Sequence, residues 1–250
     1  MGNKIYYADN LEVLKSIPSA SIDLIYIDPP FNTGKTQSLH DKSYSDDFAN
    51  FEDFIYPRLK EAYRILTPRG SLYFHIDYRE VHYCKRLLDI IFGRKNFLNE
   101  IIWVYDYGAR SKTRWSAKHD NILWYVKDAN NYIFNYEEME RIPYMSPELV
   151  GKEKAEKGKT VTDTWWHTIV ATNGKERLGY PTQKPLGIIR RIVKVSSLPD
   201  STVMDFFAGS GTLGAAALES NRKFILVDNS LDAIKTMQHR FHGIADIEWL

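Results

Sequence analysis

Short apolar segments with the spacing of β-strands alternate with helical segments at both ends of the chain. The expected strands are residues 4–8, 22–27, 71–76, 101–105, 202–206 and 224–227. The expected helices are residues 11–17, 51–66, 80–92, 186–196, 212–220 and 231–241. Strands that alternate with helices usually form a parallel sheet covered on both faces. We therefore predict an α/β fold with a mostly parallel sheet and helices on both of its faces.

The composition fits one such domain with a sizeable insertion. The chain has 250 residues, of which 44% are hydrophobic and 26% charged, as in ordinary globular proteins. No apolar run approaches the roughly 20 residues that a membrane span needs, and residues 1–10 lack the apolar core of a signal peptide. Cys84 is the single cysteine, which fits a reducing compartment. We therefore expect a cytoplasmic protein without a membrane partner.

A net charge of +1 disfavours a protein that coats nucleic acid with a wholly basic surface. The basic residues that stand out gather in one stretch without an acid: Arg110, Lys112, Arg114 and Lys118. Trp115 lies among them. This stretch is a candidate for local nucleic-acid binding, and a solvated loop face is the alternative interpretation.

Two segments interrupt the alternation. Residues 32–50 are polar with little periodicity, which predicts a long loop. Residues 106–180 are charged, aromatic and irregular. In that second segment, Trp165 and Trp166 either stack on bases or fill a core, and the sequence favours neither interpretation.

A glycine-containing turn connects the fifth predicted strand to the next helix. It spans residues 205–212, and Gly209 and Gly211 let backbone amides approach a ligand closely at the N-terminus of a helix. Asp228 follows the next strand, where an acid can bind the two ribose hydroxyls of a nucleoside. The pattern predicts a nucleoside-type ligand, whereas a simple tight turn with a capping Asp is the alternative.

The most specific signal is Asp28-Pro29-Pro30-Phe31 at the end of a predicted buried strand. Two prolines stiffen the backbone, so that the Asp28 carboxylate and the Pro29 carbonyl point into one space, and Phe31 adds a flat apolar face. Two acceptors beside an aromatic ring suit a planar ligand that carries an NH2 group. A capped, proline-stiffened turn would be the default interpretation of the motif alone.

Three motifs occur in a defined order: Asp28-Pro29-Pro30-Phe31, then Tyr-Pro-Thr-Gln-Lys-Pro at 180–185, then Phe-Ala-Gly-Ser-Gly-Thr at 207–212. In this order they resemble the β-class of bacterial DNA amino-methyltransferases, in which the catalytic motif precedes the recognition region and the cofactor motif comes last. The resemblance spans nearly the whole chain. It implies a Rossmann-like fold that binds S-adenosylmethionine, with a permuted motif order. Phe206 and Phe31 depart from the commoner proline and tyrosine without removing an acceptor or the stacking face.

The resemblance also implies roles for residues. Asp28, Pro29, Pro30 and Phe31 would be catalytic. The resemblance says least about the recognition region, where the local charge alone makes Arg110, Lys112, Arg114 and Lys118 the expected DNA-binding residues. The residues implied at the cofactor are Asp9, Asn10, Thr182, Lys184, Asp205, Phe207, Ala208, Gly209, Ser210, Gly211, Thr212, Asp228 and Asn229. Within this set, Asp228 would hold the ribose, and Thr182 and Lys184 would lie near the methionine carboxylate. Residues 1–105 would form the catalytic half, 106–180 the target-recognition region and 181–250 the cofactor-binding half.

These motifs predict methyl transfer to the N6 amino group of adenine in double-stranded DNA, with the target base flipped out of the duplex. Asp28 favours adenine, because cytosine-N4 members of the class commonly carry Ser there. Cytosine-N4 transfer, a silent DNA-binding subunit and a nicotinamide dehydrogenase are the alternatives, and the last lacks its Gly-x-Gly-x-x-Gly near the first strand. A cognate restriction endonuclease and a homodimer stay open as partners. No metal is expected, since His239 and His242 lack further ligands.

Overall fold

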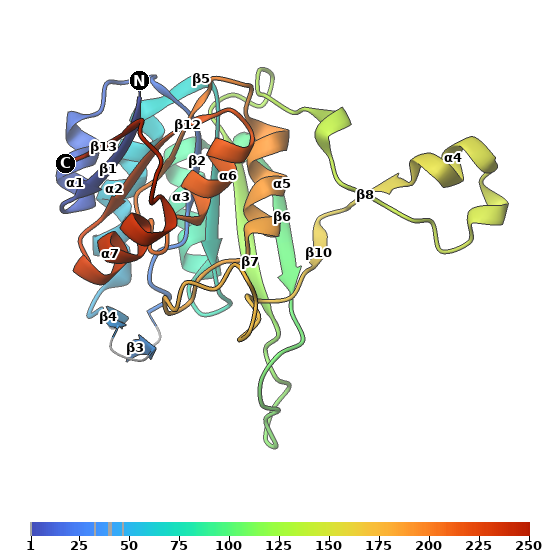
Figure 1. Ribbon diagram of the computed structural model, residues 1–250, viewed down its shortest axis with the longest axis horizontal. Coiled ribbons are helices and arrows are strands. Elements are labelled where there is room, and N and C mark those ends of the chain that lie inside the picture. Colours follow the sequence, from blue (N-terminus) through green and yellow to red (C-terminus); the bar gives the residue numbers. More distant parts are fainter. Residues whose placement is uncertain (1, 33, 40–41, 47) are drawn as a thin grey trace.

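The computed structural model describes residues 2–32, 34–39, 42–46 and 48–250. A nine-stranded sheet forms the centre of the molecule (Figure 1). Its strands are β1 (Asn3–Tyr7), β2 (Ile22–Ile27), β5 (Leu66–Ile76), β6 (Phe97–Val104), β7 (His119–Val126), β10 (Thr164–Trp166), β11 (Thr202–Asp205), β12 (Lys223–Asp228) and β13 (Ile247–Trp249). The strand order is β10-β6-β7-β5-β2-β11-β12-β1-β13.

The described sheet is mostly parallel, as predicted. Only β7 runs against its neighbours β5 and β6, while the other neighbouring strands pair in parallel. In a parallel sheet the carboxyl ends of the strands meet at one edge, and ligands bind outside that edge. The topology therefore gathers the turns after β1, β2, β11 and β12.

Helices cover both faces of the sheet. One layer contains α1 (Asn10–Ser16), α2 (Phe51–Ile65) and α3 (Val81–Phe92), and the other contains α5 (Leu186–Ser196), α6 (Thr212–Glu219) and α7 (Leu231–Arg240). Successive side chains of β2 point to opposite faces of the sheet. Ile25 and Ile27 pack against the first helix layer, and Leu24 and Tyr26 pack against the second. The predicted helices on both faces are confirmed.

Two expectations of irregular structure are wrong. Residues 32–50 contain an antiparallel pair, β3 (Lys35–Leu39) and β4 (Lys42–Asp46), which polar composition alone did not reveal. The segment 106–180 contains β7, whose residues from Asp120 to Val126 are all buried. The apolar run of β7 is short and lies between irregular segments, so its sequence pattern did not indicate a strand. Of the two tryptophans, Trp165 is buried in the core, whereas Trp166 is 70% exposed.

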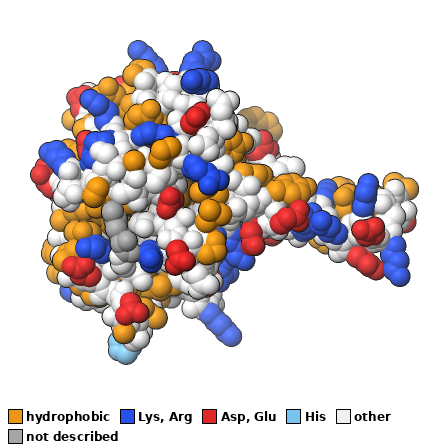
Figure 2. All heavy atoms as spheres, turned by 90° about the horizontal axis from the view of Figure 1, so that it is seen from above, with side chains coloured by type: hydrophobic (Ala, Val, Ile, Leu, Met, Phe, Trp, Pro, Cys, Tyr) orange, Lys and Arg blue, Asp and Glu red, His pale blue; other side chains and the backbone are white. Residues whose placement is uncertain are grey.

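Two segments project from the body. The first, which we call the arm, comprises residues 141–160, with β8 (Arg141–Ile142), η3 (Pro147–Leu149), α4 (Lys152–Lys157) and β9 (Lys159–Thr160). Figures 1 and 2 show the arm standing clear of the sheet and its helices. The second, the basic loop, comprises residues 106–118 between β6 and β7. Among the described residues, no helix is long and apolar enough to cross a membrane.

Candidate active site

Four carboxylates stand near the ends of neighbouring parallel strands. Asp9 lies just after β1 and Asp28 directly follows β2, whereas Asp205 and Asp228 end β11 and β12. They border one cavity of about 480 Å³, large enough for a small organic ligand. Of the residues expected at a cofactor, all but Gly211 line this cavity.

Asp28 presents an unsatisfied acceptor at this cavity. Its Oδ2 accepts a hydrogen bond from Lys184 Nζ at 2.5 Å, whereas its Oδ1 is buried and has no hydrogen-bond partner within the described part of the chain. Pro30 lines the cavity beside it, and the Phe31 ring lies 4.9 Å from Lys184 Nζ. Leaving a buried acceptor unpaired is costly, so Oδ1 is suited to accept a hydrogen bond from a ligand.

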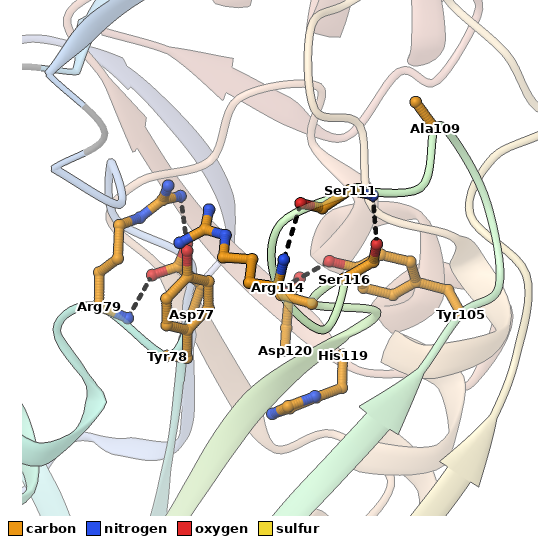
Figure 3. Close-up of a pocket in the computed structure, with 11 residues that line it drawn as sticks. Asp77, Tyr78, Arg79, Tyr105, Ala109, Ser111, Arg114, Ser116, His119 and Asp120 are labelled. Carbon is orange, nitrogen blue, oxygen red and sulfur yellow. Dashed lines mark hydrogen bonds and ion pairs between the residues drawn. The ribbon is translucent and has the colours of Figure 1, made fainter.

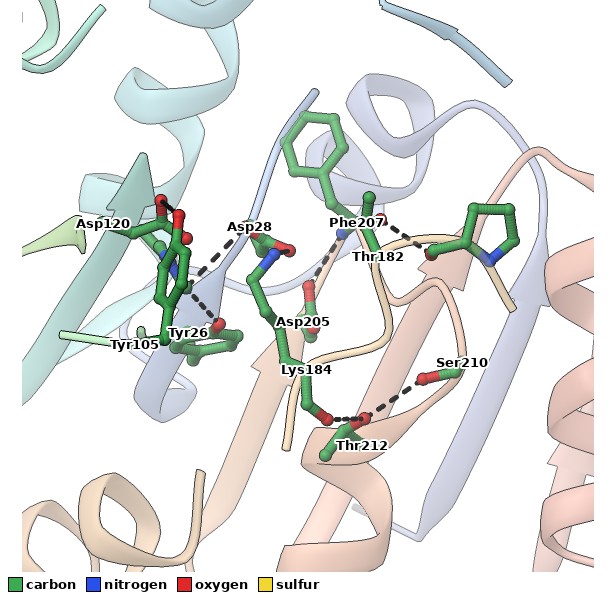
Figure 4. A network of polar contacts seen from close by, with 12 residues as sticks. Tyr26, Asp28, Tyr105, Asp120, Thr182, Lys184, Asp205, Phe207, Ser210 and Thr212 are labelled. Atoms are coloured by element: carbon green, nitrogen blue, oxygen red, sulfur yellow. Dashed lines mark hydrogen bonds and ion pairs between the residues drawn. The ribbon is translucent and has the colours of Figure 1, made fainter. Parts of the chain in front are cut away.

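A buried polar chain lies behind Asp28 (Figure 4). The His75 ring is fully buried on β5, with Nδ1 2.8 Å from the Tyr26 hydroxyl and Nε2 3.2 Å from Asp120 Oδ2. Tyr105 donates a hydrogen bond to Asp120 Oδ1 at 3.0 Å. Burial works to raise the pKa of Asp120, but His75, Lys184 and Tyr105 together hold that pKa below its usual range. The sequence did not predict this hydrogen-bond network, because Asp120 and His75 come together only through the pairing of β5 with β7.

The glycine turn after β11 is fixed by Asp228. Gly209 (φ +49°) and Gly211 (φ +74°) both adopt left-handed backbone conformations, which glycine tolerates best. The Gly209 N–H donates to Asp228 Oδ2 at 2.8 Å, and the Ser230 N–H donates to Oδ1 at 2.9 Å. A carboxylate has about four lone-pair sites, so Asp228 can still accept a hydrogen bond from a ligand. The turn and the acid therefore form one unit that faces the cavity.

Two of the cavity acids carry an electrostatic cost. Burial raises the pKa of Asp228, and the backbone N–H groups of Ser230 and Gly209 only partly offset that rise. Burial raises the pKa of Asp205 still further above its usual range, and the charges of Asp28 and Asp228 add to it. This end of the cavity thus favours ligand groups that donate hydrogen bonds.

Arg58 is a cavity residue that sequence reasoning missed. This buried arginine on α2 donates to Asn10 Oδ1 at 2.6 Å and to Asp9 Oδ2 at 3.2 Å. Asn10 in turn donates to the Phe206 carbonyl at 2.6 Å. Asp9 and Asn10 therefore tie α1 and α2 to the turn after β11. The helical spacing of α2 gave no sign that one of its buried positions is charged.

Lys184 lines the cavity and also contacts Asp28, a contact that the sequence did not predict. It lines the cavity together with Thr182, as expected for a position near a cofactor carboxylate. Its ammonium, however, pairs with Asp28 and lies over the Phe31 ring. Thr182 has a φ of +56°, which strains a non-glycine residue, and the neighbouring Gln183 is held by the Glu176 carbonyl at 2.6 Å. The strained turn brings Lys184 across the sheet edge to Asp28.

The basic stretch lies outside this cavity, on the basic loop. Arg110 forms an ion pair with Asp106 at 2.6 Å, and Lys118 donates to the carbonyls of Tyr107 and Ala109. Two of the four cations therefore build the loop. Arg114 lines a second cavity of about 320 Å³ (Figure 3). Lys112 lies on the same exposed loop.

Metal ligands do not cluster in the part of the chain that the structure describes. No group of three or more His, Cys, Asp or Glu side chains there is arranged to hold a metal ion. The polar groups that line the described cavity are carboxylates, amides and hydroxyls, together with Lys184 and Arg58.

Three comparisons with known proteins agree with this geometry. The family described as DNA methylase, of the N6/N4 type, matches residues 22–239. The chain is 30% identical to Type II methyltransferase M.HpaI of Haemophilus parainfluenzae, over 99% of this chain and 78% of the relative. It is 32% identical to DNA adenine methyltransferase YhdJ of Escherichia coli (strain K12), over 92% of this chain and 80% of the relative.

A solved structure extends the likeness to the fold. The M1.HpyAVI–SAM complex superposes with a TM-score of 0.68 over 96% of this chain and 98% of that chain. The two sequences are 22% identical, so this likeness concerns the arrangement of helices and strands.

Proposed function

Since this chain belongs to the N6/N4 DNA methylase family, we propose that it transfers a methyl group from S-adenosylmethionine to the N6 amino group of adenine in duplex DNA. The observation that carries this proposal is Asp28 Oδ1, a buried acceptor without a hydrogen-bond partner among the described residues, at the edge of the 480 Å³ cavity.

The cavity residues fit S-adenosylmethionine. Asp228 is a buried carboxylate at the end of β12 that lines the cavity and keeps acceptor capacity for a ribose hydroxyl. Ser210 and Thr212 line the same cavity and would lie at the methionine end. The M1.HpyAVI structure of the same fold was solved with SAM. Bound S-adenosylmethionine supplies the methyl group, so the protein's task is to place and polarise the amine.

Asp28 would perform that task. A flipped adenine costs a few kcal/mol of stacking and pairing, and its amino group then replaces the missing partner of Oδ1. A carboxylate also stabilises the positive charge that would develop on the amine nitrogen as the N–CH3 bond forms and the S–CH3 bond breaks. The nitrogen would then lose one of its hydrogens as a proton to solvent. Lys184 holds Oδ2 and so turns Oδ1 toward the substrate. The Pro29 carbonyl would accept the second amino hydrogen, and Phe31 would stack on the base.

Adenine is favoured over cytosine by the carboxylate itself. Charge-assisted hydrogen bonds are roughly twice as strong as neutral ones, and an Asp holds the amine more firmly than the Ser of cytosine-N4 relatives. The relative YhdJ is named a DNA adenine methyltransferase. The name of M.HpaI, a Type II methyltransferase, supports a restriction–modification role with a cognate endonuclease. A homodimer and a cytoplasmic location complete the proposal.

Residues 106–180 would supply target recognition, between a catalytic half at 1–105 and a cofactor half at 181–250. Lys112 and Arg114 are the cations of the basic loop best placed to meet DNA phosphates, because Arg110 and Lys118 are engaged within the loop. The strands β7 and β10 are the exceptions in this region, since both belong to the sheet.

The proposal is tested with purified protein, labelled S-adenosylmethionine and DNA. Wild-type protein should transfer label to DNA, and Asp28→Ala should transfer none while its affinity for the cofactor stays within about tenfold, or 1.4 kcal/mol. Calorimetry provides the cofactor affinity. Cofactor and DNA binding without transfer by the wild type would instead identify a silent DNA-binding subunit, and retained turnover in the variant would remove Asp28 from the mechanism.

A further inference from the structure

Trp115 is the most exposed large hydrophobic side chain that the structure describes. Its indole lies on the basic loop and is 98% exposed, whereas Trp103, Trp124 and Trp165 lie in the core. Tryptophan is highly buried on average because its apolar area is large. An indole so fully in water contributes nothing to the folded chain, so a partner that covers it would explain its position.

The loop is built without the Trp115 side chain. Ser111 Oγ accepts hydrogen bonds from the N–H groups of Thr113 and Arg114 at 3.2 and 3.3 Å. The Ser111 N–H donates to Ser116 Oγ at 2.7 Å. These bonds fix the backbone on both sides of Trp115 and leave its ring pointing outward. The indole is therefore presented on a preformed turn, which lowers the ordering cost of binding.

The loop stands beside the catalytic carboxylate. Arg114 lines the 320 Å³ cavity, and Tyr105 and Asp120 line it too (Figure 3). Asp120 lies 3.2 Å from His75 Nε2, and His75 Nδ1 lies 3.7 Å from Asp28 Oδ1. One chain of contacts thus connects the foot of the loop to the acceptor for the target amine (Figure 4).

Flipping a base leaves a gap between two flat apolar faces in the duplex. We propose that Trp115 enters the duplex next to the target base and fills this gap, an inference that rests on the proposed DNA methyltransferase function. An exposed indole stacks on any base, and apolar wedges of this kind are used to unstack duplex steps. Lys112 and Arg114, which shortly precede Trp115 on the same loop, suit the phosphates that flank the gap. These neighbouring cations favour DNA over an apolar protein partner.

The test compares Trp115→Ala, Trp115→Phe and wild type on a duplex that carries the protein's methylation site, mapped by sequencing modified bases. A second duplex places the target base opposite an abasic site, where flipping needs little help. Trp166→Ala, which removes another exposed tryptophan, is the matched control. The fluorescence of 2-aminopurine at the target position reports the flipping itself.

We expect Trp115→Ala to lower kcat/KM on the paired duplex by about tenfold or more and to stay near wild type on the abasic duplex. Its 2-aminopurine signal should fall, Trp115→Phe should recover most of the activity, and Trp166→Ala should leave the ratio between the two duplexes unchanged. Equal losses on both duplexes would show a different DNA contact, and full activity of Trp115→Ala would exclude any role. A wild type that methylates neither duplex would overturn the proposed function instead.

Discussion

At the scale of single residues, the cavity combines two acids whose burial works against ionisation. Asp205 accepts the Phe207 N–H at 2.9 Å and faces the charges of Asp28 and Asp228, which together with burial raise its pKa. A raised pKa of a carboxyl group means that the folded state holds its proton more tightly than the unfolded state. The stabilisation that this bound proton gives the folded state is therefore fully present at pH values below the pKa of the unfolded carboxyl group. It is lost as the pH rises through the pKa of that group in the folded state.

Asp205→Asn should remove the energetic cost of ionising this buried carboxyl group. The amide keeps an acceptor for the Phe207 N–H but cannot ionise, so the variant should melt about 2–4 °C higher than wild type at pH 7 for each kcal/mol removed. The difference should shrink as pH falls toward about 4, where the unfolded carboxyl also takes up its proton. Scanning calorimetry across this pH range checks the prediction. A difference that is constant with pH, or of opposite sign, would contradict the assignment.

Single residues also show where prediction from sequence succeeds and fails. Asp28, Asp228 and the glycines follow directly after apolar strands, so a period-2 pattern and the topology of parallel sheets suffice to place them at one edge. Arg58 and His75 carry no such signal, because each lies within a segment that reads as ordinary core. Lys184 needed the strained turn at Thr182 to reach Asp28.

At the scale of elements, the alternation of strands and helices predicted both layers and most element bounds. The helix α5 occupies residues 186–196, as expected. The strand β7 was missed because its neighbours in sequence form projecting segments, so no turn signals bounded it. The edge strand β13 has only three residues, too few for periodicity to register. Pairing with distant strands decides such elements, and one sequence does not reveal it.

The basic loop carries an electrostatic prediction. Lys112→Ala/Arg114→Ala should weaken DNA binding and reduce the slope of log affinity against log salt by about 1.8, at about 0.9 per lost phosphate contact. Arg110→Ala should change the slope less, because Asp106 already neutralises that guanidinium. Lys235→Ala, on an exposed position of α7, is the control. Fluorescence anisotropy titrations at several salt concentrations measure the slope, and an unchanged slope in the double variant would remove the loop from the DNA interface.

At the scale of the whole molecule, the arm is separable from the folded body. No residue from 134 to 164 is buried, and the Val161 N–H donates to the Glu140 carbonyl, so the two ends of the arm are adjacent. Lys and Glu alternate along α4, and both signs of charge appear on the arm in Figure 2. An element that buries so little adds little to stability.

Replacing residues 141–160 with a short Gly-Ser linker should therefore change the free energy of unfolding by less than about 1 kcal/mol. Affinity for S-adenosylmethionine should also be unchanged, since the cavity draws no residue from the arm. Methylation of the cognate site should be lost if residues 106–180 supply recognition. Denaturant titration, calorimetry and a methylation assay test these outcomes in turn. Full site-specific activity without the arm would confine recognition to the basic loop and its surroundings.

The central claim is that this cavity methylates the N6 amino group of adenine. The most direct measurement is mass spectrometry of nucleosides from DNA treated with purified protein and S-adenosylmethionine, with Asp28→Ala as the paired control. We predict N6-methyladenine with the wild type and unmodified DNA with the variant. N4-methylcytosine without N6-methyladenine would contradict the account.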